Sequence, residues 1–208
     1  HIEILQKDKN NTLVHLYTTD KEGQFTPLKL AKEKGYDVLN LDGILDMHFV
    51  NFLEQKLEKV SFTRIDADVM DKLIQKEEAL PSKLSEEQQK KLKETFEQTV
   101  NKDVFSVMLE NMQDDELPVY ITKPEFLRRW NDMQKMTGET GFYGMEMEKA
   151  NININTNHPL VNAIVNETNE TKAKNLSKQL VDLAMLSQQM LKGEALSDFI
   201  NRSIEMMK

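Results

Sequence analysis

Residues 176–207 read LSKQLVDLAMLSQQMLKGEALSDFINRSIEMM, and this stretch predicts how the chain ends. Apolar residues from Leu176 to Leu191 recur at helical spacing and form a broad band on one helix. Gly193 suits the left-handed turn that ends a helix, and a narrower apolar stripe follows it up to Met207. The pattern therefore predicts two antiparallel helices that close the chain.

The apolar band on the first of these helices is wider than one neighbouring helix can cover, so a second partner is expected. Each fully buried Leu, Ile or Phe contributes roughly 1.5–3 kcal/mol, so about six per subunit give on the order of 20–30 kcal/mol gross in a pair of subunits. Association costs about 4–15 kcal/mol, which leaves room for a two-fold homodimer built as a four-helix bundle. The residues expected at this dimer interface are Leu180, Leu183, Leu186, Leu196, Phe199, Ile200 and Ile204. The alternative is that the surplus apolar faces pack on the domain's own sheet.

The segment before the helical pair predicts a mixed domain of strands and helices. Residues 151–155 alternate Ile with Asn, as in a strand with one buried face. Residues 104–112 and 117–122 look like the two strands of a hairpin. Residues 85–88 read SEEQ, a capping box in which the hydroxyl and the amide each satisfy a backbone donor at the start of a helix. We therefore expect a mixed α+β domain over 85–208.

The first part of the chain predicts a small α/β module. Residues 13–17 alternate as a short strand, a helix with Pro27 in its first turn ends at Gly35, and residues 36–41 form a second strand. A strand, a helix and another strand make a βαβ unit, in which the two strands pair in parallel. We place this module over 1–72.

The two domains are expected to be joined by a linker over 73–84. This segment is rich in Lys and Glu and contains Pro81, a composition that suits an exposed connection better than a core element. The predicted fold class is thus α+β: a βαβ module, a linker, and a mixed domain that ends in the helical pair.

The composition excludes several classes of function. The formal net charge is -8, and Lys and Arg are interleaved with acids, so binding to nucleic acid is not expected. No apolar run is long enough to cross a bilayer, so we expect no membrane partner. The chain has no Cys, which excludes disulfides and thiolate metal sites and is compatible with the cytoplasm. It opens with His1 and has no signal segment, as expected of a piece of a longer protein.

A second apolar stripe lies on the helix predicted over 124–136. Phe126, Leu127, Trp130 and Met133 share one side of this helix. An ordinary core-facing stripe is one interpretation. The other is an exposed ledge that holds other proteins, because flexible Met side chains suit surfaces with many partners and eight of the twelve Met follow from residue 133 onward.

The residues give little support to catalysis. Asp66 and Asp68 resemble a metal-binding carboxylate pair, but they follow a predicted strand, where such a pair more often starts a helix. The four His residues have no ligand-like spacing, and the Gly-rich loop over 137–144 lacks the Lys-Ser or Lys-Thr ending of a phosphate cradle. We expect no metal and no cofactor, and a hydrolase with a carboxylate site near Asp66 remains a minor hypothesis.

Residues 153–161, Asn-Ile-Asn-Thr-Asn-His-Pro-Leu-Val, closely resemble a turn of the heat shock protein 90 family. In the family's C-terminal domain this strand-to-helix turn usually reads Glu-Ile-Asn-Pro-Asp-His-Pro-Ile-Val. Thr156 replaces the family's Pro and Asn157 its Asp, and both changes keep turn-forming chemistry. Further stretches of the chain resemble the family in the family's order: residues 35–39 with 46–53, residues 126–136 with Met145, Glu148 and Lys149, and residues 183–204.

The resemblance implies that the chain is the end of the middle domain followed by the C-terminal dimerisation domain. In the family, ATP and Mg are bound by parts that precede this piece, so the piece itself is expected to be non-catalytic. The chain ends at Lys208 without the acidic Glu-Glu-Val-Asp tail of cytosolic eukaryotic relatives, so binding of their tetratricopeptide co-chaperones is not expected and the bacterial branch is favoured.

The function that the resemblance implies is homodimerisation together with the binding of unfolded or partly folded clients in the cytoplasm, as part of the stress response. The client-binding residues would be Phe126, Leu127, Trp130, Met133 and Met145. The alternative is a structural adaptor that binds one folded partner through its C-terminal helices. The two hypotheses differ in the range of proteins that the chain should bind, because an adaptor would not bind chemically unrelated unfolded proteins.

Overall fold

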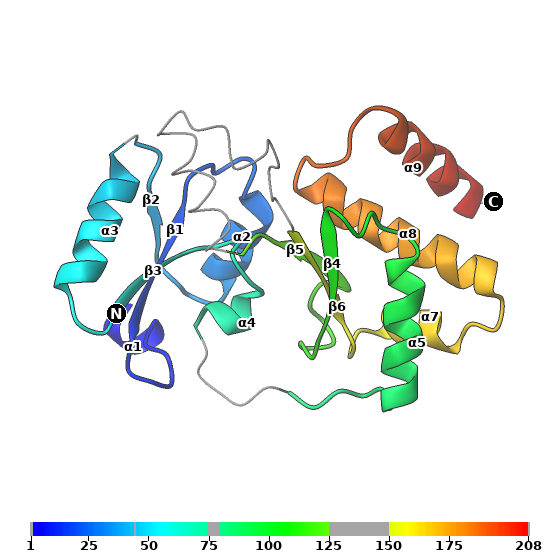
Figure 1. The fold of residues 1–208 in the computed structure, drawn as a ribbon, viewed down its shortest axis with the longest axis horizontal. Helices are drawn as coiled ribbons and strands as arrows, with labels where there is room; N and C mark the ends of the chain where they lie inside the picture. Colours follow the sequence, from blue (N-terminus) through cyan, green and yellow to red (C-terminus); the bar gives the residue numbers. More distant parts are fainter. Residues whose placement is uncertain (1, 44, 75–79, 125–149, 208) are drawn as a thin grey trace. The chain divides into compact units, whose positions relative to one another are not determined.

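A computed structural model describes residues 2–43, 45–74, 80–124 and 150–207 of the chain (Figure 1). The described residues divide into two compact units, the first comprising residues 2–74 with Pro124 and the second comprising residues 80–123 and 150–207. The predicted linker over 73–84 spans this division. At its two ends, Leu73 and Ile74 are buried in the core of the first unit, and Leu84 is buried in the core of the second.

The first unit is built on a three-stranded parallel sheet. The strands are β1 (Leu13–Thr18), β2 (Val38–Asn40) and β3 (Val60–Arg64), in the order β2-β1-β3. Its helices are α1 (Ile2–Leu5), α2 (Phe25–Glu33), α3 (Asp46–Lys56) and α4 (Met70–Leu73). The parallel pairing of β1 with β2 across α2 confirms the predicted βαβ unit.

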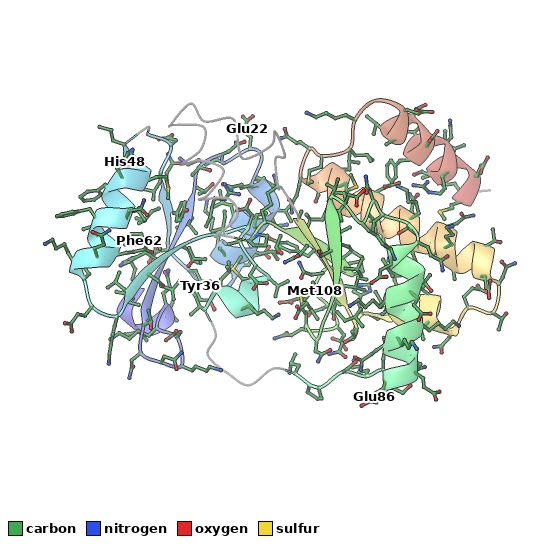
Figure 2. The ribbon with its side chains drawn as sticks, in the orientation of Figure 1. Glu22, Tyr36, His48, Phe62, Glu86 and Met108 are labelled. Atoms are coloured by element: carbon green, nitrogen blue, oxygen red, sulfur yellow. The ribbon has the colours of Figure 1, made fainter. Side chains whose placement is uncertain are left out.

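Helices cover both faces of this sheet because the side chains of β1 alternate between them. Val14 and Leu16 pack with α2 and α4 on one face, and Tyr17 packs with Val50 and Phe62 on the face that α3 covers. Figure 1 shows α3 on the opposite side of the sheet from α2 and α4, and Figure 2 shows Phe62 between the sheet and α3.

The second unit has a three-stranded mixed sheet. Its strands are β4 (Phe105–Glu110), β5 (Val119–Thr122) and β6 (Ala150–Asn155), in the order β4-β6-β5. The predicted hairpin is therefore wrong, because β6 lies between the two strands, parallel to β4 and antiparallel to β5. Ile152 and Ile154 of β6 are fully buried, and Asn153 and Asn155 on its other face are buried too, so the prediction of a single buried face was wrong.

In the described part of the second unit, the helices are α5 (Glu86–Glu97), α7 (Pro159–Asn166), α8 (Glu170–Ser187) and α9 (Gly193–Met206), and the first three contribute side chains to the core. The capping box predicted at Ser85 is present, with both of its hydrogen bonds. The left-handed residue directly after α8 is Gln189, with φ of 57°. Gly193 is left-handed as predicted, with φ of 59°, but it begins α9, so the prediction that it ends the first helix was wrong. Within the described residues, no helix combines the length and apolar character that crossing a bilayer requires.

Candidate interaction face

Helix α8 has one face in the core of the second unit and another turned toward α9. Leu180, Val181 and Ala184 are buried in the unit's core. The helical period places four other side chains on an adjacent stripe, at i, i+3, i+4 and i+7. These residues are Gln179, Asp182, Leu183 and Leu186. The stripe is polar in its first half and apolar in its second.

Helix α9 buries a single side chain, Phe199, which is 8% exposed. Ile200 and Ile204 of α9, and Met207 directly after its end, recur at i, i+4 and i+7 on a different side of the helix and are 48%, 51% and 85% exposed. Leu183 and Leu186 of α8 are 46% and 39% exposed. Together these five residues are called the exposed apolar face below.

The seven residues predicted at a dimer interface therefore fall into two groups. Leu183, Leu186, Ile200 and Ile204 are exposed, and Leu196 is half-buried. Leu180 and Phe199 are buried within the chain itself, and Leu180 is part of the core of the second unit. An interface with another molecule would therefore use the first group.

A cluster of polar side chains, which no pattern in the sequence predicted, joins α8 to α9. Asp182 is 1% exposed, and its carboxylate accepts hydrogen bonds from Arg202 and Lys178. Arg202 Nε also donates to Gln179 Oε1 at 2.8 Å, and Gln179 Nε2 donates to Ser203 Oγ at 2.8 Å. The available signal was a single Asp within the apolar run VDLAML, since a buried carboxylate needs a partner.

The turn that carries the family resemblance is a hub of buried hydrogen bonds. Asn157 is 5% exposed; its Nδ2 donates to the Pro81 and Met112 carbonyl oxygens, at 3.2 and 3.0 Å, and its Oδ1 accepts from the Lys83 N–H at 2.8 Å. Asn155 Nδ2 donates to the Gln113 carbonyl at 2.6 Å. The turn thus ties the segment before α5 and the β4–β5 connection to the end of β6, and its role is structural.

His158 begins α7 at the end of this turn. Its Nδ1 accepts a hydrogen bond from the Leu160 N–H at 3.1 Å, which satisfies one of the free donors at the helix start. Burial lowers the pKa of His158 below its ordinary value, and the negative charge of Asp114 partly opposes this effect. Both the hydrogen bond and the burial favour the neutral imidazole.

The five residues predicted to bind clients, Phe126, Leu127, Trp130, Met133 and Met145, lie outside the described residues. The carboxylates of the minor hydrolase hypothesis are described. Asp66 is paired with Arg64 through two hydrogen bonds, to Nε at 2.5 Å and to Nη2 at 2.9 Å, and Asp68 Oδ1 accepts from the Val69 N–H. Within the described part of the chain, no three His, Asp or Glu side chains are grouped as metal ligands would be.

Comparison with known proteins gives a consistent result. No protein-family model matches the chain. Chaperone protein HtpG of Porphyromonas gingivalis strain ATCC 33277 is 38% identical over 188 residues, which cover 89% of this chain and 28% of that protein. The proteins of the same name from Bacteroides thetaiotaomicron and Bacteroides fragilis strain 638R are 31% identical over 269 residues, which cover 97% of this chain and 40% of theirs. Because 269 exceeds the chain's 208 residues, the Bacteroides proteins carry residues within the aligned range that have no counterpart here.

These matches confirm the resemblance in the sequence: the chain belongs to the heat shock protein 90 family of chaperones. Within that family, it is similar to part of the bacterial chaperone protein HtpG. The chain spans between 28% and 40% of the length of these relatives.

Proposed function

We propose that the chain is the homodimerisation and client-holding part of an ATP-dependent molecular chaperone. The single observation that carries this proposal is the exposed apolar face, on two helices whose opposite sides are already packed within the unit. ATP and Mg would be bound by parts of the full-length protein that precede this piece. The chain itself supplies attachment: to a second copy of itself and to unfolded proteins.

A second copy of the chain fits the exposed apolar face for two reasons. A two-fold contact brings the same surface of each subunit together, so apolar residues of one copy meet apolar residues of the other. The charges also complement each other: α9 carries Glu194, Asp198 and Glu205 against one Arg, whereas α8 carries three Lys against two acids. Contact of α9 with the partner's α8 would therefore pair opposite charges around an apolar centre.

The experiment on dimerisation introduces two charges into the face. Ile200→Asp with Ile204→Asp should convert the dimer into a monomer in sedimentation equilibrium, because carboxylates would be desolvated in the contact without partners. Phe199 is unsuitable for this test, since it is buried within the chain and its substitution would disturb α9 itself.

The control is Asn201→Asp. This residue is exposed on α9 and lies about 100° around the helix from Ile200. This control should keep the dimer mass. A wild-type chain that sediments as a monomer, or a dimer that survives both Ile substitutions, would remove the dimerisation proposal.

Client holding is assigned to the predicted helix with Phe126, Leu127, Trp130 and Met133, together with Met145. The support is the family resemblance and the gathering of the chain's one Trp with several Met, which suits promiscuous apolar contacts. Dimerisation would present two weak sites together, which raises avidity without a strong single contact.

The experiment on client holding measures the binding of an unfolded model protein to the intact dimer. Trp130→Ala should weaken this binding without changing the dimer mass, whereas Arg128→Ala, on the opposite side of the predicted helix, should have little effect. Equal binding by the Trp130 variant would show that this side chain is ordinary core. Failure of the wild-type chain to bind several unrelated unfolded proteins would favour an adaptor with one folded partner.

A further inference from the structure

Either of two sides of helix α9 could face α8, and the side richer in apolar residues is the one that faces away from it. The outer side carries Leu196, Ile200 and Ile204, with Met207 beyond the helix end. The inner side carries Phe199, Arg202 and Ser203. Because apolar burial is roughly proportional to area, hydrophobicity alone would favour turning α9 by about one residue, or 100°, so that the Ile residues face α8.

The polar cluster between the helices opposes such a rotation. We call Gln179, Asp182, Arg202 and Ser203 the α8–α9 clamp. Arg202 donates from Nη2 to Asp182 and from Nε to Gln179, so its planar guanidinium is held by two residues of α8 at once. Ser203 accepts from Gln179 at 2.8 Å and donates to the Phe199 carbonyl at 2.7 Å. Rotation of α9 would break the three bonds between the helices.

Breaking these bonds would leave a poorly paired charge in a buried place. Asp182 is 1% exposed, and the side chain of Arg202 is 18% exposed. Lys178 would remain beside Asp182, but it lies on the same helix and cannot hold α9. A buried ion pair adds little net stability compared with apolar packing, yet it penalises every arrangement in which one partner is unpaired. Its directional bonds therefore select an arrangement.

We propose that the α8–α9 clamp is a positioning device that fixes the rotation of α9 and thereby keeps Ile200 and Ile204 on the outside. Arg202 and Asp182 are positioning residues: they select which face of α9 is presented to another molecule. The effect of the clamp on association rests on the proposed homodimer. Its effect on the orientation of α9 belongs to a single chain and can be measured without any partner.

The orientation of α9 can be measured through the reactivity of a single introduced thiol, because the chain contains no Cys. In an Ile204→Cys background, diluted until sedimentation shows only monomer, the thiol should react rapidly with a maleimide. Adding Arg202→Met should slow this reaction by about fivefold or more, because α9 then turns residue 204 toward α8.

The matched control is Lys178→Met, which removes the other cation that contacts Asp182 but leaves α9 attached. It should leave the labelling rate unchanged. Simple loosening of α9 would leave the rate of the Arg202 variant unchanged or raise it, and either result would overturn the proposal. An equal slowing in both variants would also overturn it, since the cause would then be the charge of Asp182 and not the orientation of α9.

Association supplies the second measurement, with Ile204 intact. Arg202→Met should raise the dimer dissociation constant by about tenfold or more, and Lys178→Met by less than about threefold. Equal dissociation constants for the two variants would overturn the role of the clamp in association. If the wild-type chain never dimerises, the proposed function fails, and the labelling experiment still decides whether the clamp orients α9.

Discussion

The second unit buries polar side chains in two places, and the two places are built differently. In the turn over 155–157, the partners are mostly backbone groups, such as the carbonyls of Pro81, Met112 and Gln113. In the α8–α9 clamp, the partners that cross between the helices are all side chains. Both clusters satisfy buried polar atoms, as a folded protein requires.

The two clusters determine different features of the unit: the turn determines its fold, and the clamp determines how α8 and α9 pack. Backbone partners are fixed by the strands and connections to which they belong, so the turn has one arrangement and its loss affects the fold. Side-chain partners on two helices could be exchanged for another packing of the same helices, so the clamp selects between packings. The family's most recognisable motif thus supports the fold, whereas the less conspicuous Asp182 and Arg202 concern the interaction face.

The largest expected effect is in the turn. Asn157→Ala removes three hydrogen bonds to backbone groups and leaves those groups buried. Because an unsatisfied buried polar group costs about 1–3 kcal/mol, the free energy of unfolding of the second unit should fall by about 3 kcal/mol or more. Urea unfolding followed by circular dichroism measures this loss.

Asn162→Ala is the control for that substitution. Asn162 is half-buried and donates only to the carbonyls of Thr156 and His158, at 3.4 and 3.0 Å. Its removal should cost about 1 kcal/mol, the net value of an ordinary hydrogen bond. An equal loss of unfolding free energy in the two variants would show that the buried backbone partners of Asn157 do not add to its contribution to stability.

A smaller effect on stability is expected in the clamp. Asp182→Met with Arg202→Met replaces the ion pair by two apolar side chains whose combined volume is roughly that of the pair, so the free energy of unfolding should change by less than about 1–2 kcal/mol. The dimer should nevertheless weaken, because α9 loses its fixed rotation. A double variant that keeps wild-type dimer affinity would show that apolar packing alone orients α9.

Local patterns in the sequence predicted those parts of the fold that local interactions determine. The capping box at Ser85 and the helix end at Gly35, where φ is +74°, depend on neighbouring residues. The position of β6 depends on pairing with strands that are distant in the chain, so the short spacing of β4 and β5 wrongly indicated a hairpin. Periodicity identifies a strand but not its neighbours.

The same limit applies to the candidate face. Periodicity predicted two apolar helices and a surplus of apolar side chains, and Leu183, Leu186, Ile200 and Ile204 are indeed exposed. It could not indicate that Leu180 and Phe199 are used inside the chain, because α9 has two possible inner faces. The choice depends on hydrogen bonds between side chains that are about twenty residues apart, such as Asp182 with Arg202 at a separation of 20.

The smallest expected effect is a pH dependence that belongs to the turn and not to the clamp. Burial lowers the pKa of His158 from its ordinary value of 6.5, so the folded unit favours the neutral imidazole. The contribution of His158 to stability is fully present above pH 6.5, the pKa of the unfolded state. It is lost as the pH falls below that value and passes through the lower pKa of the folded state. The second unit should therefore be slightly less stable at about pH 5 than at about pH 7.5.

His158→Asn isolates this contribution, because Asn is a good residue at a helix start and does not titrate in this range. Urea unfolding at the two pH values should show a smaller difference for this variant than for the wild type. His48→Asn, an exposed position on α3 of the first unit, should leave the difference for the second unit unchanged (Figure 2). A difference that persists in full in the His158 variant would assign the pH dependence to other groups, and the turn would then be a fixed element of the fold at every pH.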